Sequence, residues 1–239
     1  MPTISLCMIV KNEEKYLEQC LNSVKDLVDE IIIVDTGSTD KTKEIAARFT
    51  DKIYDFEWCD DFAAARNKSL KHATSDWILV LDADEVVSKE DYNEIKAAVN
   101  NWNISGFRFL TRNYSNNTSV SGWCPCSNDD VFGKDFSNTI QGWYPSIKVR
   151  LFQSKQDIFF VGKMHELVDV SIQNKEGRVV SLRAPIHHYG TLNENNTSDK
   201  KKRYMGLIKE KVAANPENAK AYFELGVLHK ELGQLNLAE

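Results

Sequence analysis

Acidic residues at two points in the first half of the chain have the residue types and spacing of a metal or nucleotide site. Asp82 and Asp84 follow an apolar run at residues 77–81, and Asp35 follows another at residues 31–34. Carboxylate oxygens suit Mg²⁺ and Mn²⁺, which proteins usually hold with one or two carboxylates plus substrate phosphates. If the strand stays extended, Asp82 and Asp84 point the same way and can face one ligand. The alternative is a solvated acidic turn that opens a helix.

The residues after Asp35 are typical of a tight turn between a strand and a helix. Gly37 permits the turn, and Ser38 or Thr39 can cap the next helix. An ordinary strand-to-helix turn would have the same composition. Two acidic strand ends in one strand–helix array favour a site, because the carboxyl ends of adjacent parallel strands share a crevice.

Hydrophobic periodicity indicates which elements position these residues. Apolar runs predict strands at residues 4–10, 30–35, 52–55 and 77–81. Helical spacing predicts helices at residues 13–25, 39–49, 62–73 and 89–99. This alternation predicts an α/β fold with a mainly parallel sheet flanked by helices, whose ligands bind at the carboxyl ends of the strands.

The pattern changes after residue 101. Further strands are predicted at residues 106–111, 147–152, 158–161 and 178–182, and residues 187–189 end the sheet. Residues 113–145 are rich in Asn, Ser, Gly, Asp and Trp and have no clear period. A stretch of that length inside a compact domain is usually a lid or a binding loop.

Composition and charge argue against several classes of protein. The 239 residues carry a formal net charge of −5, unlike a general nucleic-acid binder. The apolar runs are far shorter than the ~18–20 residues that span a bilayer, so we expect no transmembrane segment. No basic segment precedes residues 4–10, which argues against a secretory signal. Five scattered cysteines favour a reducing, cytoplasmic location over a disulfide framework.

The last part of the chain has the signature of a helical repeat. A polar linker is expected at residues 193–198, and helices at residues 199–214 and 219–232. The spacing of a tetratricopeptide repeat is matched by Tyr222, Leu225, Gly226, His229, Gly233 and Ala238. A plain amphipathic helix with a glycine cap is the alternative. Because one repeat cannot bury its apolar face alone, we expect a repeat cut short within a longer protein.

Four motifs occur in this order, at residues 9–14 (IVKNEE), 34–40 (VDTGSTD), 62–67 (FAAARN) and 81–85 (LDADE). Together they resemble the nucleotide-sugar-binding half of family 2 glycosyltransferases with a GT-A fold. Residues 162–166 (GKMHE) and 188–190 (HYG) resemble the bacterial branch with C-terminal tetratricopeptide repeats. The resemblance implies a Rossmann-like, mixed, mainly parallel sheet. The expected domains are a GT-A domain at residues 1–190, a linker and helix at 191–215, and a truncated first repeat at 216–239.

The resemblance implies roles on the donor side of the site. The matching residues are Asn12, Glu14, Asp35, Arg66, Asn67 and Asp82. Asn12 and Glu14 would line the base and ribose pocket, and Asp35 would accept a hydrogen bond from the base, typically uracil. The helical pair, Arg66 and Asn67, would hold the nucleotide side of the pocket. Asp82 would lie near the ribose.

The resemblance also implies a metal site at Asp84, completed by His188. His187 could take the place of His188 in this register, so both remain open, and a satisfied histidine pair at a strand end is the alternative. Imidazole is a plausible ligand for Mn²⁺ and a poorer one for Mg²⁺. The metal would stabilise the leaving nucleoside diphosphate as a Lewis acid. The basic residues 200–203 would add charge there or form a solvated helix face.

An inverting sugar transfer needs a base that deprotonates the acceptor. Glu166 is the candidate because it follows an apolar run and Gly162, and His165 beside it would orient it. Asp60 and Asp61 are rival carboxylates. The alternative is an ordinary pair of residues at a helix start.

Aromatic residues in or beside the irregular loop are candidates for an acceptor site. Trp123, Trp143 and Tyr144 could stack on a sugar, or they could simply pack the loop.

We therefore expect a metal-dependent, inverting glycosyltransferase that uses Mn²⁺ or Mg²⁺. It would move a sugar from a nucleotide sugar, with UDP as the expected nucleotide, to a glycan, lipid-linked or protein acceptor. The repeat would bind a protein partner, and the location would be the cytoplasm, including the inner face of the membrane. One rival is a noncatalytic repeat scaffold with a vestigial donor site. The other is a nucleotidyltransferase, which would carry a Gly-rich basic loop where this chain has residues 11–14 (KNEE).

Overall fold

The computed structural model describes residues 1–127 and 140–192, and, nearer the C-terminus, 205–206, 208–209, 212–213, 216–217 and 219–231. The strands are β1 Ile4–Val10, β2 Glu30–Asp35, β3 Ile53–Asp55, β4 Trp77–Val80, β5 Glu85–Val87, β6 Gly106–Tyr114, β7 Cys124–Pro125, β8 Gly142–Gln153, β9 Val179–Ser181 and β10 Ile186–His188. The helices are α1 Leu17–Val24, α2 Thr42–Ala46, α3 Phe62–Leu70, α4 Tyr92–Ala98, α6 Asp169–Gln173 and α8 Ala219–Glu231, with 3₁₀ turns η1 Lys89–Asp91 and η2 Gly190–Leu192. The chain divides into two compact units, Met1–Leu192 and Asn193–Glu239.

The strands of the first unit form one mixed sheet in the order β3-β2-β1-β4-β8-β6-β10-β5. β7 pairs with β8, and β9 pairs with β6. β1 is parallel to β2 and β4, and β2 is parallel to β3. β8 is antiparallel to both of its neighbours on this path, β4 and β6. This arrangement confirms the expected α/β fold with a mixed, mainly parallel sheet.

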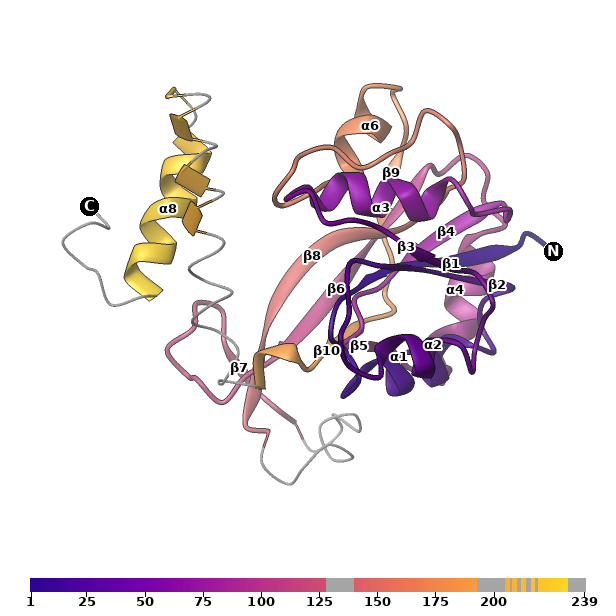
Figure 1. The fold of residues 1–239 in the computed structure, drawn as a ribbon, viewed down its shortest axis with the longest axis horizontal. Helices are drawn as coiled ribbons and strands as arrows, with labels where there is room; N and C mark the ends of the chain where they lie inside the picture. Colours follow the sequence, from indigo (N-terminus) through magenta and orange to yellow (C-terminus); the bar gives the residue numbers. More distant parts are fainter. Residues whose placement is uncertain are drawn as a thin grey trace. The chain divides into compact units, whose positions relative to one another are not determined.

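Helices cover both faces of the sheet (Figure 1). α1, α2 and α4 lie on one side, and α3 and α6 lie on the other. On the first side, Met8 of β1 belongs to the same buried cluster as Leu17 and Ile95. On the second side, Cys7 of the same strand belongs to a cluster with Ala63. Successive residues of β1 therefore serve two cores, which explains why the run at residues 4–10 is apolar except for Ser5.

Two segments near the site differ from what was expected. Residues 158–161 are not a strand, although Ile158 and Phe160 are buried. Val161 forms only an isolated bridge with Leu167. Residues 82–85 are a turn, because the N–H of Glu85 donates to the carbonyl of Asp82 at 3.0 Å. Glu85 then opens β5, a strand that was not predicted.

The stretch expected to be irregular is partly sheet. β6 continues to Tyr114, β8 begins at Gly142, and the two-residue strand β7 lies between them in the chain. Residues 128–139 lie outside the described residues. The ends of the two long strands, β6 and β8, could therefore not be recognised from the turn-rich composition of this stretch.

The second unit contains α8, which matches the helix predicted at residues 219–232. The expected linker, the basic residues 200–203 and the repeat positions Gly233 and Ala238 lie outside the described residues. None of the helices in the described part of the chain combines the length and apolarity needed to cross a membrane.

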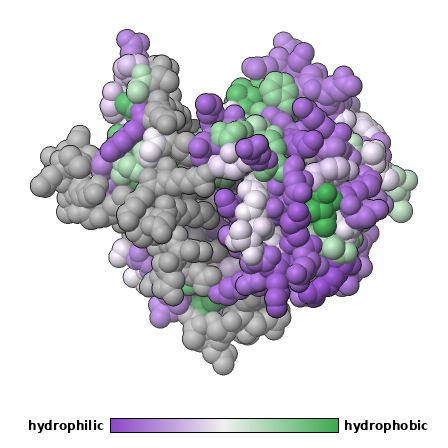
Figure 2. Space-filling view, viewed as in Figure 1, coloured by the Kyte–Doolittle hydropathy of each residue, from purple (hydrophilic) through white to green (hydrophobic). Residues whose placement is uncertain are grey.

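Most of the first unit's surface seen in Figure 2 is hydrophilic, with small separate apolar patches. The large apolar side chains are instead concentrated in the two buried clusters against the sheet. The apolar runs of the sequence are thus mainly explained by the core.

Candidate active site

Asp35 lies at the carboxyl end of β2 and is 2% exposed. Its Oδ2 accepts hydrogen bonds from the backbone N–H groups of Gly37, at 3.0 Å, and Ser38, at 2.9 Å. Gly37 has a φ of 101°, a conformation that glycine adopts without strain. Oδ1 of Asp35 is buried and has no hydrogen-bond partner in the structure. An unpaired buried acceptor is costly, so this oxygen suits an N–H group of a ligand.

Asn12 and Glu14 join the loop after β1 to the loop after β2. Asn12 has a left-handed φ of 56°, and its Oδ1 accepts from the N–H of Thr39 at 2.8 Å. Its own N–H donates to Oγ of Ser38 at 2.9 Å. Oε2 of Glu14 accepts from the N–H of Lys41 at 3.1 Å. Both residues therefore brace the loop that holds Asp35, and their contact with a base or ribose stays a prediction.

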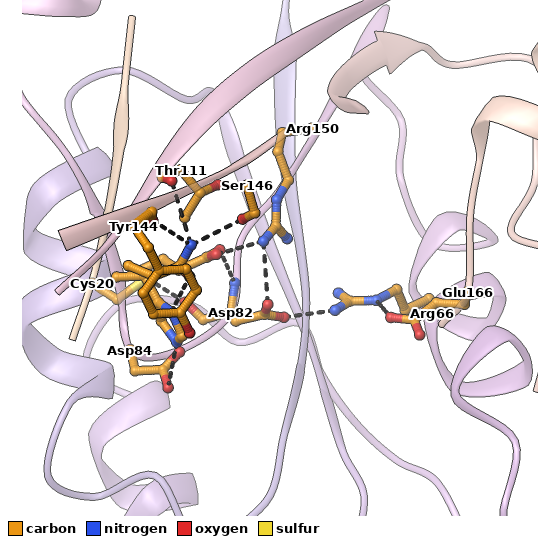
Figure 3. Close-up of polar contacts among 12 residues, drawn as sticks. Cys20, Arg66, Asp82, Asp84, Thr111, Tyr144, Ser146, Arg150 and Glu166 are labelled. Carbon is orange, nitrogen blue, oxygen red and sulfur yellow. Dashed lines mark hydrogen bonds and ion pairs between the residues drawn. The ribbon is translucent and has the colours of Figure 1, made fainter. Parts of the chain in front are cut away.

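A line of alternating charges crosses the site (Figure 3). Nη2 of Arg66, on α3, donates to Oδ1 of Asp82 at 2.6 Å, and its Nε donates to Oε1 of Glu166 at 2.6 Å. Nη2 of Arg150 lies 3.4 Å from Oδ2 of Asp82 and also pairs with Glu85. The two arginines are 7% and 4% exposed. Asp82 is thus held between two buried guanidinium groups.

The arginines in this line shift the pKa values of the neighbouring carboxyl groups. Burial alone would raise the pKa of Asp82, but the guanidinium groups of Arg66 and Arg150 hold it well below its usual range. Burial raises the pKa of Glu85, and the charge of Arg150 offsets only part of that effect. Asp82 is therefore a carboxylate at neutral pH and a firm anchor for both arginines.

Sequence reasoning missed Arg150, which reaches the site because β8 bulges. Phe107 of β6 lies opposite Leu151, and the next residue, Arg108, lies opposite Val149. Arg150 is thus left without a partner on β6, and such a bulge re-aims a side chain. One signal could have found it, because Arg150 is the charged residue within the run VRLF at residues 149–152, and such a residue is rarely buried without a partner.

Asp84 and His188 meet in a second part of the site. β10 is antiparallel to β5 with His188 opposite Glu85, so the residue before β5 lies beside the end of β10. Nε2 of His188 is 3.2 Å from Oδ2 of Asp84, and the two side chains are 21% and 18% exposed. His187 is buried, and its Nδ1 lies 2.8 Å from the hydroxyl oxygen of Tyr114. The structure thus places His188, not His187, beside Asp84.

The extended conformation expected for residues 82–84 is wrong. Because these residues form a turn, Asp82 is directed to Arg66 and Arg150 (Figure 3). Asp84 lies beside His188 instead. Among the described residues, no group of three or more His, Cys, Asp and Glu side chains could hold a metal ion. A divalent ion at Asp84 and His188 would therefore need further oxygen ligands from phosphates or water, as Mg²⁺ and Mn²⁺ sites commonly have.

The segment that carries Glu166 is fastened to α3. Nδ2 of Asn67 donates to the carbonyl of Phe160 at 2.9 Å, and its Oδ1 accepts from the N–H of Phe160 at 2.8 Å. The N–H of Phe62 donates to the carbonyl of Lys163 at 2.9 Å. The amide of Asn67 thus supports this segment, and its predicted contact with the nucleotide stays a prediction.

Glu166 lies at the end of the charge line, with its side chain 15% exposed. Together with Arg66, Lys148 and Arg150 it lines a cavity of about 30 Å³, enough for about one water molecule. His165 is exposed and has a left-handed φ of 52°. The hydrogen bond shown for Glu166 comes from Arg66, a contact that the sequence did not predict.

The rival carboxylates make local contacts. Asp61 caps α3, because its Oδ1 accepts from the N–H of Ala64 at 2.9 Å. Asp60 accepts from the indole N–H of Trp58 at 2.7 Å. Both contacts are those of residues that shape the start of α3.

The aromatic candidates are half-buried: Trp143 and Tyr144 lie in β8, and Trp123 directly precedes β7. The indole N–H of Trp123 donates to the carbonyl of Ser115 at 2.9 Å. The guanidinium of Arg112 lies over the ring of Trp143, 5.1 Å from its centre. These contacts are those of loop packing, and stacking on an acceptor stays a prediction.

The sequence of the chain matches the family model for glycosyl transferase family 2 over residues 5–154, which is more than half of its length. The chain belongs to glycosyltransferase family 2. This confirms the expected family and the expected enzyme class. The matched region of this family 2 domain contains Asp35, Arg66, Asp82 and Asp84, whereas Glu166 and His188 lie beyond it.

Known proteins resemble this family 2 chain over most of its length. A TPR repeat-containing protein of Synechococcus elongatus is 34% identical over 100% of the chain and 55% of the relative. Glycosyltransferase SunS of Bacillus phage SPbeta is 33% identical over 94% of the chain and 49% of the relative. The chain therefore spans about half the length of these curated relatives.

A solved structure shows the same fold. It is glucosyl-3-phosphoglycerate synthase from Mycobacterium tuberculosis in complex with Mn²⁺ and UDP-glucose, with a TM-score of 0.52. It is 16% identical, and the match covers 87% of this chain and 77% of that one. The likeness confirms the GT-A-like fold expected for a family 2 domain.

Proposed function

We propose that residues 1–192 bind a UDP-sugar and a divalent metal, and that they transfer the sugar with inversion to a glycan, lipid-linked or protein acceptor. The buried, unpaired Oδ1 of Asp35 is the observation that carries this proposal. It would accept a hydrogen bond from the ring N–H of uracil, at the edge of the sheet where parallel strands bind ligands. The solved relative that holds Mn²⁺ and UDP-glucose supports the same class of donor.

Asp84 and His188 would hold Mn²⁺ or Mg²⁺ beside the diphosphate. Their oxygen and nitrogen atoms suit Mn²⁺, and both side chains are partly exposed to a ligand. A bound cation would neutralise the charge that the leaving diphosphate gains. Asp82, fixed by two arginines and 36% exposed at its side chain, would accept from a ribose hydroxyl.

Glu166 would take the proton of the acceptor hydroxyl or thiol. As the acceptor forms its bond to the anomeric carbon, the bond from that carbon to the diphosphate breaks and the diphosphate leaves with the electron pair. Arg66 would keep the carboxylate of Glu166 in place through their 2.6 Å hydrogen bond.

Residues 216–239 would begin a tetratricopeptide array that binds a protein partner in the cytoplasm. Tyr222 and Phe223 of α8 are 50% and 73% exposed, and an isolated repeat leaves its apolar face uncovered in this way. The repeat-containing relative of Synechococcus elongatus supports this assignment.

Calorimetry tests the donor and metal sites together. UDP should bind the protein, and Mn²⁺ should tighten that binding. Asp84→Ala should abolish the metal-dependent part while metal-free UDP binding remains. Asp26→Ala, which alters an exposed side chain, serves as the control and should bind UDP and Mn²⁺ like the wild type. If UDP does not bind with or without divalent ions, the proposal is wrong.

Glu166→Gln tests catalysis separately from binding. The variant should bind UDP like the wild type but should no longer hydrolyse or transfer UDP-sugars. Release of UDP measures both reactions. Retained turnover would remove Glu166 as the base. A wild-type protein that binds UDP but turns over no nucleotide sugar from a panel would favour the noncatalytic scaffold.

A further inference from the structure

We propose that Gly190 and Asn113 are positioning residues for the divalent cation at Asp84 and His188. Gly190 would leave space for the pair, and Asn113 would orient the imidazole. The inference rests on the proposed function, because it assumes that this pair binds a metal. Neither residue was among the predicted site residues.

Gly190 follows β10 and lies against both proposed ligands. A Cβ atom added to Gly190 would overlap Oδ2 of Asp84 and would lie 2.8 Å from Nε2 of His188. The φ of Gly190 lies outside the left-handed range, so the close approach, not backbone conformation, is what requires glycine. Any larger residue would displace the two atoms that would bind the cation.

Asn113 fixes which nitrogen of His188 carries hydrogen. Its Nδ2 donates to the carbonyl of Tyr144 at 3.0 Å and to Oγ of Ser146 at 3.1 Å. A carbonyl can only accept, so the other amide atom, Oδ1, must face Nδ1 of His188, which lies 2.8 Å away. Nδ1 therefore donates to Oδ1, and the neutral ring has its free electron pair on Nε2. This is the nitrogen that faces Asp84.

This arrangement is typical of how proteins prepare a histidine for a metal. A ligating histidine usually donates its other ring N–H to an oxygen, which sets the tautomer and the ring orientation. Asn113 is 7% exposed, so water does not compete strongly for its amide. Two neighbouring ligands of an octahedral ion, each about 2.1 Å from it, lie about 3 Å apart. The 3.2 Å between Nε2 of His188 and Oδ2 of Asp84 fits that spacing.

The test measures metal affinity without relying on turnover. Mn²⁺ binding is titrated by electron paramagnetic resonance with saturating UDP, and UDP binding is measured separately in EDTA. Gly190→Ala and Asn113→Leu should each weaken Mn²⁺ binding about 10–100-fold, as changes to residues that support metal ligands commonly do. UDP binding in EDTA should stay at the wild-type level, which shows that the nucleotide pocket is intact.

Gly177→Ala is the matched control for steric strain. Its Cβ would lie 2.6 Å from Cγ2 of Ile172 and 2.9 Å from Oγ of Ser105. The added methyl group would thus meet residues other than the two proposed metal ligands. This variant should melt at a lower temperature and keep the Mn²⁺ affinity of the wild type. Asn113→Asp keeps an oxygen that accepts from Nδ1 of His188, but its second oxygen would face the carbonyl of Tyr144, so it should recover part of the affinity lost in Asn113→Leu.

The outcomes separate this inference from the proposed function. If the wild type binds UDP but not Mn²⁺, the metal part of the proposed function is wrong. If the wild type binds Mn²⁺ and both variants match it, the positioning roles are wrong. If Gly190→Ala fails to fold, the comparison of Asn113→Leu with Asn113→Asp decides, and equal affinities in those two variants would overturn the role of Asn113.

Discussion

Arg150 and Glu85 are both almost fully buried, so each depends on the other for charge compensation. Arg150→Met should lower the free energy of unfolding by about 3–5 kcal/mol, because it leaves Glu85 buried without its partner. The double change Arg150→Met with Glu85→Gln should recover much of that loss. Urea denaturation measures both. A loss under about 1 kcal/mol in the single variant would contradict this account of the pair.

Asp35 offers a sharper test of nucleotide recognition than deletion of a side chain. In Asp35→Asn the amide oxygen would keep the N–H groups of Gly37 and Ser38, so the amide NH₂ would face the base. The amide NH₂ and the ring N–H of uracil, both donors, would then face each other. UDP binding should weaken about 10–100-fold, as for a lost hydrogen bond to a charged group. Calorimetry measures the change, and Asp55→Asn, at the exposed end of β3, is the control.

At the scale of single residues, the sequence predicts what backbone position alone determines. The position of Asp35 could be predicted because the apolar run at residues 31–34 predicts the strand that it ends, whereas its contact with a base stays a prediction. The choice between His187 and His188 could not be made, because it depends on how β10 pairs with β5, which places His188 opposite Glu85 and so beside Asp84. Arg150 was missed because only the bulge in β8 brings it to Asp82.

At the scale of elements, Glu30 ties the start of β2 to three other segments. Its carboxylate accepts from the hydroxyl of Ser5, from Lys52, and from the N–H of Thr74 at 2.9 Å. Burial opposes ionisation, but these hydrogen bonds outweigh it and lower the pKa of Glu30 from 4.5 to about 2. The ionised form is therefore favoured in the folded state.

This shift predicts how stability depends on pH. The stabilisation from Glu30, on the order of 2 kcal/mol, should be complete above about pH 4.5 and should disappear as the pH falls toward 2. Glu30→Gln should therefore destabilise the protein at pH 7 and have little effect near pH 2. Urea unfolding across this range measures the difference. Glu18→Gln is the control, since its pair with Arg48 is exposed, and a loss from Glu30→Gln that does not change with pH would refute the prediction.

Asn67 holds the segment that carries Glu166 against α3 through two hydrogen bonds to Phe160. Asn67→Ala removes both hydrogen bonds to Phe160, so amide hydrogens of residues 158–167 should exchange faster. Hydrogen-exchange mass spectrometry checks this, with Asn100→Ala on the surface as the control. Unchanged exchange in this segment would show that the apolar contacts of Ile158 and Phe160 are sufficient to hold it.

The same segment shows why some elements escape prediction. The apolar run at residues 158–161 looks like a strand, because burial under a loop and burial in a sheet select the same residues. β5 is missed for the opposite reason, since it has only three residues and directly follows an acidic turn. Apart from β5 and the turn before it, the order of strands and helices at residues 4–99 was predicted correctly, because several elements agreed there.

At the scale of the whole molecule, the proposed donor, metal and base residues all lie in the unit Met1–Leu192. A protein truncated after Leu192 should therefore unfold cooperatively and bind UDP within about threefold of the full chain, because its three buried clusters remain complete. Thermal denaturation and calorimetry test this. Loss of UDP binding in the shorter chain would show that the second unit contributes to the site.

The pairing of β10 with β5 also sets an order of events in time. Asp84 is synthesised early, but His188 and Gly190 belong to the last strand and turn described in the first unit. Contacts between segments so distant in the chain form late, because closing a long loop costs entropy. The edge of the sheet around Asp35, where we propose that the base binds, is made from nearby segments and can form first. The protein would then acquire its affinity for Mn²⁺ at the final stage of folding, when β10 pairs with β5.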